Sequence, residues 1–354
     1  MKIIDQYIGR TVIGAILMVM LILVAIFSFF EFIDELDSLG RGRYGITEVI
    51  EYVLLKIPGL TYKLFPMGAL IGALMGLGTL VASSEMTVIR AAGVSLPRTV
   101  ISVMKAATLV IILALVIGEF IAPYTQQQAN TLRSVAMANQ ITLKSQYGFW
   151  ARDGHSYINI RKILPGDRIE NIQIYEFDDS NRLRVSTHAK AAEYRDGAWL
   201  LQGIEQTELH DDRVVSRHVD RAAWGSLLSP ELINVVVIKP QNLTLWGLVK
   251  YIRYLRGNSQ NTLQYEQALW VKLSYPLAIA AMVFLAIPIV LSGIGTATTG
   301  QRIMLGALIG LAFHIINQAS SQLGLLLNLN QFLSAVLPTV LVVVAGLVLM
   351  RRTV

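Results

Sequence analysis

The chain has 354 residues, of which 54% are hydrophobic and 15% are charged, whereas about 25% of the residues of an ordinary soluble domain are charged. It contains no cysteine, which excludes disulfides, thiolate chemistry and cysteine-based metal sites. The formal net charge of +6 could indicate nucleic-acid binding, but the basic residues form no dense run and lie among acidic ones, so we expect no nucleic-acid partner.

The first predicted membrane helix is the uncharged apolar run of residues 12–30, which is long enough to cross a bilayer core of about 30 Å. Lys2 and Arg10 precede it, as in a signal peptide. The run is too long for the apolar part of a signal peptide, however, and Glu31 and Phe32 follow it in place of a cleavage site with small residues. We therefore expect a retained membrane anchor.

Two more spans follow a charged loop. The second lies within residues 57–81, although two prolines interrupt it and Lys63 lies inside it, and the third covers residues 100–122. Three glycines of the second span recur every four residues and share one helical face. Small residues at this spacing let membrane helices approach closely, so this face is predicted to pack against another helix. The glycines are Gly68, Gly72 and Gly76.

A short helix is predicted between the second and third spans, over residues 84–94. Ser83 and Ser84 can cap its N-terminus, where Glu85 is also favourable. Gly93 is a plausible C-terminal stop, and Pro97 cannot lie inside the same helix. A short helix held between two spans on one side of the membrane is a surface on which a partner protein can act.

The chain changes character from residue 124 to about residue 265, where charged residues are frequent and no run is long enough to span a membrane. Stretches of alternating apolar and polar residues recur there between turn signals such as Asp153-Gly154. Many short strands at this spacing indicate an antiparallel sandwich or jelly roll. The predicted strands are residues 146–151, 156–160, 169–177, 183–194, 199–201, 206–209, 214–224 and 233–238.

Helices return after Pro240. An amphipathic helix capped by Thr244 is predicted over residues 245–256, and three spans follow, over residues 268–291, 303–327 and 332–350. The predicted fold class is thus an α-helical membrane protein with six transmembrane helices and an inserted all-β, jelly-roll domain. Its parts are residues 1–123 (spans 1–3 and the short helix), 124–243 (the β domain) and 244–354 (the amphipathic helix and spans 4–6).

The short loops predict the orientation, because cytoplasmic loops carry an excess of Lys and Arg. With a cytoplasmic N-terminus, that side carries eight such residues against three on the other side. Both termini and the short helix are then cytoplasmic, and the β domain is periplasmic or extracellular. The eight are Lys2, Arg10, Arg90, Arg98, Lys105, Arg302, Arg351 and Arg352, and the three are Arg41, Arg43 and Lys56.

Motifs for catalysis or nucleotide binding are missing from the sequence. It has no GxxxxGK[ST], HExxH or GxSxG, and its five histidines have no metal-ligand spacing, so we expect no catalytic residue, no metal site and no P-loop. His314, Asn317 and Gln318 share one face of a span, where bonds between helices are favoured over catalysis. Glu119 and Lys63 are charges within spans, and they are either functional or snorkel to the nearby interface.

Five segments spread over nearly the whole chain carry a family resemblance: residues 5–10 (DQYIGR), 65–74 (FPMGALIGAL), 84–93 (SEMTVIRAAG), 148–151 (GFWA) and 265–272 (YEQALWVK). In these segments the chain resembles the LptF/LptG-type permeases, the membrane subunits of the ABC transporter that extracts lipopolysaccharide from the inner membrane. The last segment, with residues 248–252 before it, makes the chain more similar to LptG than to LptF.

The resemblance implies a non-enzymatic permease in the inner membrane of a Gram-negative bacterium. Its partners would be an LptF-type permease, with which it forms a cavity open to the bilayer, an LptB-type ATPase dimer that binds ATP and Mg²⁺, and an LptC/LptA-type periplasmic jelly roll that receives the lipid by strand pairing. This chain itself would hold no cofactor. The short helix would be the coupling helix that docks on the ATPase, with contact residues Ser84, Glu85, Met86, Ile89, Arg90, Ala91 and Gly93.

The resemblance also implies cations at a glycolipid-facing rim, because Lys and Arg form charge-assisted hydrogen bonds to phosphate. The chain departs from the family pattern at the end of the first span, where acidic residues precede the cations, and at Gly59, where a lysine is expected. Candidates for headgroup contact are Asp34, Arg41, Arg43, Lys63 and Arg133; candidates for acyl-chain contact, with helix packing as the alternative, are Leu64, Phe65 and Met67.

Two other functions stay open at this stage. A membrane-anchored assembly protein would use the β domain only to bind a partner, without transport activity. An intramembrane enzyme would need a catalytic pair at membrane depth.

Overall fold

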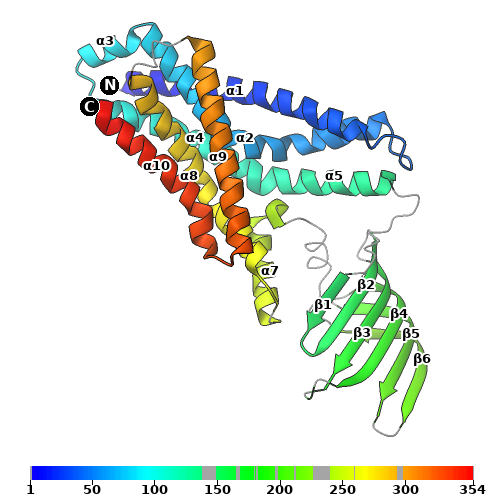
Figure 1. Cartoon of the computed structure of the whole chain (residues 1–354). Coiled ribbons are helices and arrows are strands. Elements are labelled where there is room, and N and C mark those ends of the chain that lie inside the picture. The colour runs from blue at the N-terminus through cyan, green and yellow to red at the C-terminus, as the bar shows by residue number, and fades with distance from the viewer. Residues whose placement is uncertain are drawn as a thin grey trace.

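The structure is a computed structural model that describes residues 2–137, 149–164, 168–178, 180, 182–195, 198–210, 213–225, 240–258, 260–292 and 298–353. A helical bundle holds both termini and the short helix α3 (Glu85–Ala91) at one end, and a β-sheet lies beyond the other end (Figure 1). The sheet is inserted between α5 (Ala122–Met137) and α7 (Leu245–Gly257).

Six helices of the described chain are long and apolar enough to cross a membrane, as predicted. The third is longer than predicted, because α4 (Leu96–Val116) continues through a π-helical turn, η1 (Ile117–Ile121), into α5. Residues 124–137, which the sequence places in the β domain, are therefore helical. The other long helices are α1 (Lys2–Leu36), α2 (Ile46–Ala82), α8 (Leu263–Leu291), α9 (Thr299–Leu326) and α10 (Gln331–Thr353).

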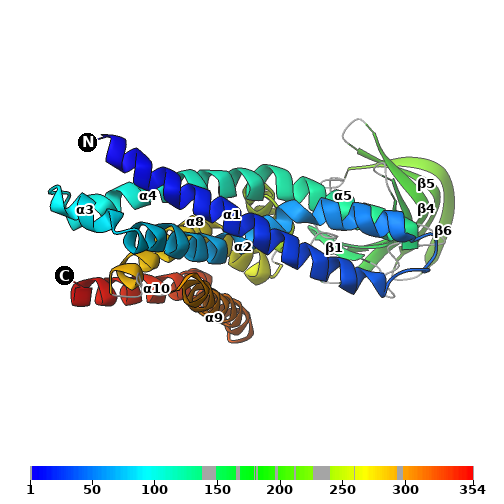
Figure 2. The ribbon, with the colours of Figure 1, turned by 90° about the horizontal axis from the view of Figure 1, so that it is seen from above.

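The glycine ladder of α2 packs against α1, which runs beside it in Figure 2. A Cβ atom added at Gly72 would lie 2.4 Å from Cα of Ile16, and one added at Gly76 would lie 3.0 Å from Cα of Val12. The two helices thus approach backbone to backbone, which only small residues permit. Gly68 faces the Met20 side chain in the same groove.

Prolines inside the spans leave backbone carbonyls without an intrahelical donor, and neighbouring helices supply one. Pro66 in α2 frees the carbonyl of Tyr62, which accepts a hydrogen bond from the Tyr275 hydroxyl of α8. Pro338 in α10 frees the carbonyl of Ser334, which accepts from a serine hydroxyl of α9 at 2.7 Å. These bonds let α2 and α10 continue through proline, so α2 does not end at the prolines that interrupt its sequence.

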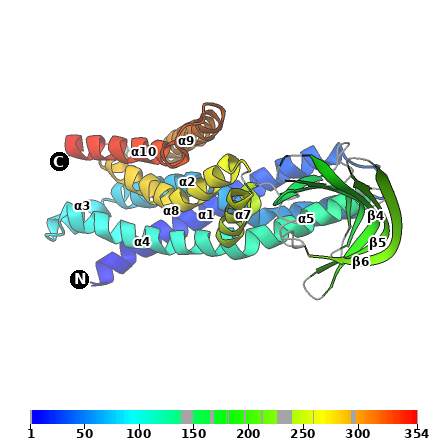
Figure 3. The ribbon, with the colours of Figure 1, turned by 90° about the horizontal axis from the view of Figure 1, so that it is seen from below.

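The β domain is a six-stranded antiparallel sheet in which consecutive strands pair, so the described strands form one curved meander (Figure 3). Its concave core contains Ile158, Ile160, Ile172, Ile174 and Trp199. Of the predicted strands, residues 233–238 lie outside the described residues. The strands are β1 (Phe149–Asp153), β2 (Ser156–Leu164), β3 (Arg168–Phe177), β4 (Leu183–Arg195), β5 (Ala198–Leu209) and β6 (Val214–Trp224).

Strand β5 is continuous, whereas the sequence predicts two strands separated at Gly203. The backbone at Gly203 has φ +63°, and an added Cβ would lie 2.9 Å from Cδ of Lys190 on the neighbouring strand. Asn171, which is opposite Lys190 on its other side, also has a positive φ, of 56°. Ordinary strand residues do not adopt this conformation, so the pairing of the strands is interrupted at this row and resumes in the same register on either side of it.

Candidate functional site

Charged side chains gather where α1, α2 and α5 run side by side, toward the β domain (Figure 2). Glu35 of α1 accepts a hydrogen bond from Arg133 Nε of α5 at 2.7 Å, and Glu31 of α1 is paired with Lys56 of α2. Tyr52 lies one turn before Lys56, and its ring centroid is 4.9 Å from Lys56 Nζ and 5.6 Å from the Arg133 guanidinium carbon. Three helices are therefore joined by two ion pairs that share one aromatic ring.

The turn between α1 and α2 closes this cluster. Ser38 Oγ accepts a hydrogen bond from Arg133 at 3.2 Å, and the Arg43 amide donates to the carbonyl of Ala136 at 2.7 Å. Tyr44 is almost fully buried here, and burial together with the neighbouring Glu35 carboxylate raises the pKa of its hydroxyl well above the usual range. The hydroxyl thus stays neutral.

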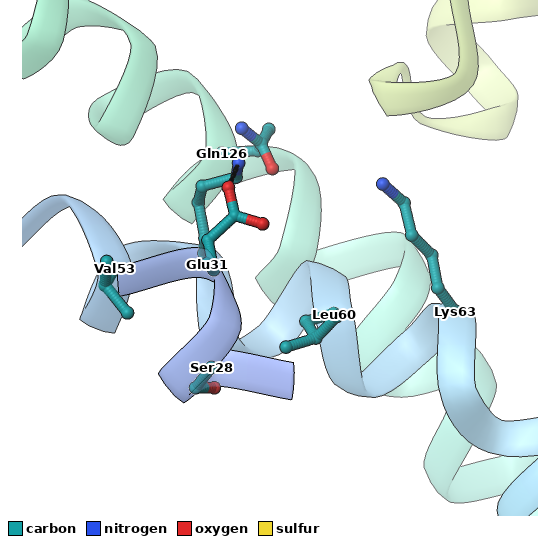
Figure 4. Close-up of a pocket in the computed structure, with 7 residues that line it drawn as sticks. Ser28, Glu31, Val53, Leu60, Lys63 and Gln126 are labelled. Atoms are coloured by element: carbon teal, nitrogen blue, oxygen red, sulfur yellow. Dashed lines mark hydrogen bonds and ion pairs between the residues drawn. The ribbon is translucent and has the colours of Figure 1, made fainter. Parts of the chain in front are cut away.

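A small cavity of about 50 Å³ opens beside the Glu31–Lys56 pair. Figure 4 shows Gln126 next to Glu31, whereas Lys63 extends from α2 on the other side of Leu60. Polar and apolar side chains both line the cavity, and two lysines, Lys56 and Lys63, line it from positions two turns apart on α2. Its lining residues are Ser28, Glu31, Val53, Lys56, Leu60, Lys63 and Gln126.

The structure separates the predicted headgroup residues into two groups. Lys63 and Arg133 belong to the cavity and the ion-pair cluster, respectively. Asp34, Arg41 and Arg43 are exposed at the tip of the α1–α2 hairpin. Sequence reasoning did not select Glu31, Lys56, Glu35, Tyr52 or Gln126. The sequence marks these residues only by their spacing of three, four or seven positions from other polar residues, which places them on one face of a helix.

The predicted acyl-chain residues lie within the bundle. Leu64 and Phe65 are buried in its main core, and Met67 packs over Gly310 of α9, where an added Cβ would lie 2.4 Å from Met67 Cγ. In this conformation their contacts are those of the helix-packing alternative.

Helix α3 lies at the opposite end of the bundle, held by Glu85. This carboxylate accepts hydrogen bonds from the Tyr7 hydroxyl of α1 at 2.6 Å and from Ser83 at 2.9 Å. These two hydrogen bonds, of which the one from Tyr7 has the larger effect, hold the pKa of Glu85 below its usual range. The predicted capping is wrong in detail. Ser84 has φ +60°, not the extended backbone of a serine cap, and its side chain makes no cap hydrogen bond. The Ser83 hydroxyl is directed to Glu85 and to the α2 carbonyls.

The end of α3 is formed as predicted at Gly93, whose φ is +82°. The amide of Gly93 donates to the Arg90 carbonyl and the amide of Val94 to the Ile89 carbonyl, the two bonds of a Schellman motif. Of the predicted contact residues, Met86 and Ile89 face the bundle core, whereas Ser84, Arg90, Ala91 and Gly93 are exposed. Exposed Thr87 and Val88 were missed by the sequence reasoning.

A third polar group joins the spans to α7. Glu119 in η1 lies 2.7 Å from Lys272 Nζ of α8 and accepts the Leu245 amide, at the first residue of α7, at 2.6 Å. Lys272 also donates to the carbonyl of Leu243 at 2.7 Å. At its far end α7 holds the edge strand β1: the Tyr254 hydroxyl donates to the carbonyl of Arg152 at 3.0 Å.

The described residues contain no group of three or more His, Asp or Glu side chains that could hold a metal ion. The charged clusters instead consist of cation–carboxylate pairs. Such an arrangement can bind an anionic group by exchanging a carboxylate for it, which suits a phosphorylated ligand better than a metal.

Comparisons with known proteins give one consistent result. The family model described as lipopolysaccharide export system permease LptF/LptG matches residues 6–352. The lipopolysaccharide export system permease protein LptG of Haemophilus influenzae is 30% identical over 343 residues, which cover 96% of both chains. LptG of Escherichia coli K12 is 30% identical over 353 residues, which cover 99% of this chain and 98% of the relative.

Proposed function

Because the chain belongs to the lipopolysaccharide export system permease LptF/LptG family, we propose that it is the LptG-type subunit of a transporter that extracts lipopolysaccharide from the inner membrane of a Gram-negative bacterium. One arrangement supports this proposal: a cation-rich cavity lies at the end of the bundle nearest the β domain, and a short exposed helix lies at the opposite end. A transporter driven by a separate cytoplasmic protein needs both features.

The lipid headgroup binds at the cavity between α1, α2 and α5. Lys63 lines this cavity, and a headgroup phosphate displaces Glu31 from Lys56, since phosphate and carboxylate compete for the same charge-assisted hydrogen bonds. The Glu31–Lys56 pair keeps the lysine neutralised until the lipid arrives. Arg133, held by Glu35 against Tyr52, supplies a second cation that can exchange in the same way.

An LptF-type partner covers the exposed spans. Only 22% of the apolar window of α1 and 17% of that of α9 is buried inside this chain, against 78% for α2. The polar side chains of His314 and Gln318 are exposed on α9, where bonds to a facing helix can satisfy them. The cavity beside α1 then opens to the bilayer between the two permeases.

The ATPase docks on α3 from the cytoplasm, with ATP and Mg²⁺ bound by that protein. Met86 anchors α3 to the bundle core, so a push on its exposed Val88 and Arg90 reaches the spans through this contact. On the periplasmic side, β1 is held by α7, so among the described strands β6 is the other edge of the sheet, which can pair with a periplasmic jelly roll and pass the lipid on.

Complex assembly tests the docking surface. The chain is coexpressed with an LptF-type permease and the ATPase, and Val88→Glu is compared with Val214→Glu, because both valines are about two-thirds exposed (67% and 65%) and lie at opposite ends of the molecule. We expect Val88→Glu to lose the ATPase and keep the permease partner, with Val214→Glu unchanged in both respects. An unaltered amount of ATPase with Val88→Glu would remove the docking role of α3.

A further inference from the structure

Helix α7 has one face that is exposed to solvent in the described structure. Its inner face packs against the start of α8, where the ring centroids of Tyr251 and Tyr265 are 4.5 Å apart and Arg256 pairs with Glu266 at 2.9 Å. These contacts fix the rotation of α7 about its axis. The outer face is therefore a stripe at helical spacing of exposed residues, which comprises Trp246, Val249, Lys250 and Arg253.

This stripe is unusual in composition for a face turned to water. Trp246 is 74% exposed, and Val249 lies beside it one turn on. Large apolar residues are followed by cations at the other end of the stripe, over a distance of about 10 Å along the helix. Tryptophan with nearby lysine and arginine is the combination found at the boundary between membrane and water.

The position of α7 relative to the spans places the stripe at that boundary. The first amide of α7 is bound by Glu119, so Trp246 lies at the level of the η1 turn, where Phe120 and Tyr124 are exposed. Lys272 binds the chain just before α7, and the nearby Trp270 ring packs edge-on against Phe332 at 5.0 Å, at the start of α10. Exposed aromatic rings, those of Phe120, Tyr124 and Phe332, therefore lie near the start of α7.

The packing of α7 agrees with this level. Helix α7 runs antiparallel to the first turns of α8, because Leu248 packs with Ala268, Tyr251 with Tyr265, and Arg256 pairs with Glu266. Since α8 continues from these turns into its apolar span, α7 leads outward along α8 over about 20 Å, and the apolar end of the stripe lies nearer the bilayer than the cationic end.

We propose that α7 is an interfacial helix whose outer stripe binds the anionic headgroup layer of the membrane that the chain spans, with Trp246 and Val249 in the headgroup–acyl boundary and Lys250 and Arg253 on lipid phosphates. Since Tyr254 of α7 binds strand β1, and Asn258 at the end of the helix binds the turn after that strand, this contact sets the height of the β domain above the bilayer. The proposal does not depend on lipopolysaccharide export.

The absence of cysteine makes a direct test possible in the full chain. Trp246→Cys, Val249→Cys and the control Val214→Cys, whose side chain is exposed on β6, each carry one environment-sensitive fluorophore. The labelled proteins are reconstituted in phosphatidylcholine vesicles with or without phosphatidylglycerol. Quenching is measured with spin-labelled phosphatidylcholine, with spin-labelled phosphatidylglycerol and with aqueous iodide.

The expected result is that the fluorophores at 246 and 249 are quenched by spin-labelled lipid and protected from iodide, while the one at 214 shows the reverse. Spin-labelled phosphatidylglycerol should quench more than spin-labelled phosphatidylcholine, and Arg253→Gln should lower that preference by up to about fivefold. Arg213→Gln, which removes an equally exposed charge from the β domain, should leave it unchanged.

Three results would overturn the proposal. Iodide quenching at 246 and 249 equal to that at 214 would show that the stripe faces water. Protection from both iodide and lipid would show that protein covers it. Lipid quenching without a preference for phosphatidylglycerol, unaltered by Arg253→Gln, would show that anionic headgroups are not the ligand.

Discussion

Replacing Lys272 by methionine tests the junction between the spans and α7. Methionine keeps the length of the apolar stem but removes the ammonium group, so Glu119 is left with the Leu245 amide as its donor. The two side chains are 8% and 21% exposed, respectively. Removing one partner of a fully buried pair costs about 3–5 kcal/mol, and the partial exposure of Glu119 lowers this to about 2–3 kcal/mol.

The free energy of unfolding in mixed detergent micelles measures this cost, and a double-mutant cycle with Glu119→Gln isolates the pair. Lys272→Met takes the ammonium group from Glu119 and from the Leu243 carbonyl, and Glu119→Gln leaves Lys272 with the Leu243 carbonyl but without its carboxylate. The double variant has a neutral amide that still accepts from the Leu245 amide. We expect a coupling energy of at least about 1 kcal/mol. Additive single effects, within about 0.5 kcal/mol, would refute the view that this pair links α8 to α7.

Three further variants test other parts of the structure. Gly72→Ala should destabilise the chain by about 1–3 kcal/mol in the same unfolding assay, because the added Cβ atom collides with the α1 backbone. The control Gly14→Ala, whose added Cβ has no atom within 4 Å, should not destabilise the chain. Equal effects of the two variants would exclude backbone contact at Gly72. Glu31→Gln should strengthen binding of a fluorescent lipid A analogue up to about fivefold, because an ion pair as exposed as Glu31–Lys56 contributes up to about 1 kcal/mol. Lys63→Gln should weaken this binding. Weaker binding with Glu31→Gln would contradict the exchange of carboxylate for phosphate. Hydrogen bonds lower the pKa of Glu85, so its contribution to holding α3 against α1 should persist at neutral pH and be lost only as the pH falls through a value below about 4.3. Hydrogen exchange of the α3 amides measures this loss, and a loss between pH 8 and 6 would exclude Glu85 as the cause.

Much of the fold can be predicted from the sequence, because the pattern of neighbouring residues identifies most of its helices and strands. The six spans are long apolar runs, the strands alternate, and Thr244 caps α7 by accepting the Gly247 amide at 3.0 Å, as the sequence predicts. The helical residues 124–137 were assigned to the β domain because their polar composition resembles a loop. They continue the third span since α1 and α2 extend equally far and pair with them through Arg133.

The polar clusters could not be predicted, because each joins segments far apart in the chain. Glu85 receives its shortest hydrogen bond from Tyr7, 78 residues away, and Glu119 binds residues more than 120 positions away. The sequence identifies Glu119 and Lys63 only as costly charges within spans, which leaves their partners open. The sequence likewise predicts that Gly72 lies on a face that packs against another helix, but it does not identify that helix.

ATP-driven release of lipopolysaccharide from proteoliposomes tests the proposed function most directly. The vesicles contain this chain, an LptF-type permease and the ATPase, and Glu85→Lys is compared with the unaltered chain. The account predicts ATP-dependent release by the unaltered complex and loss of release with Glu85→Lys, because the reversed charge breaks the Tyr7 contact that holds α3. No release by the fully assembled unaltered complex would contradict transport and favour an assembly protein that only binds partners.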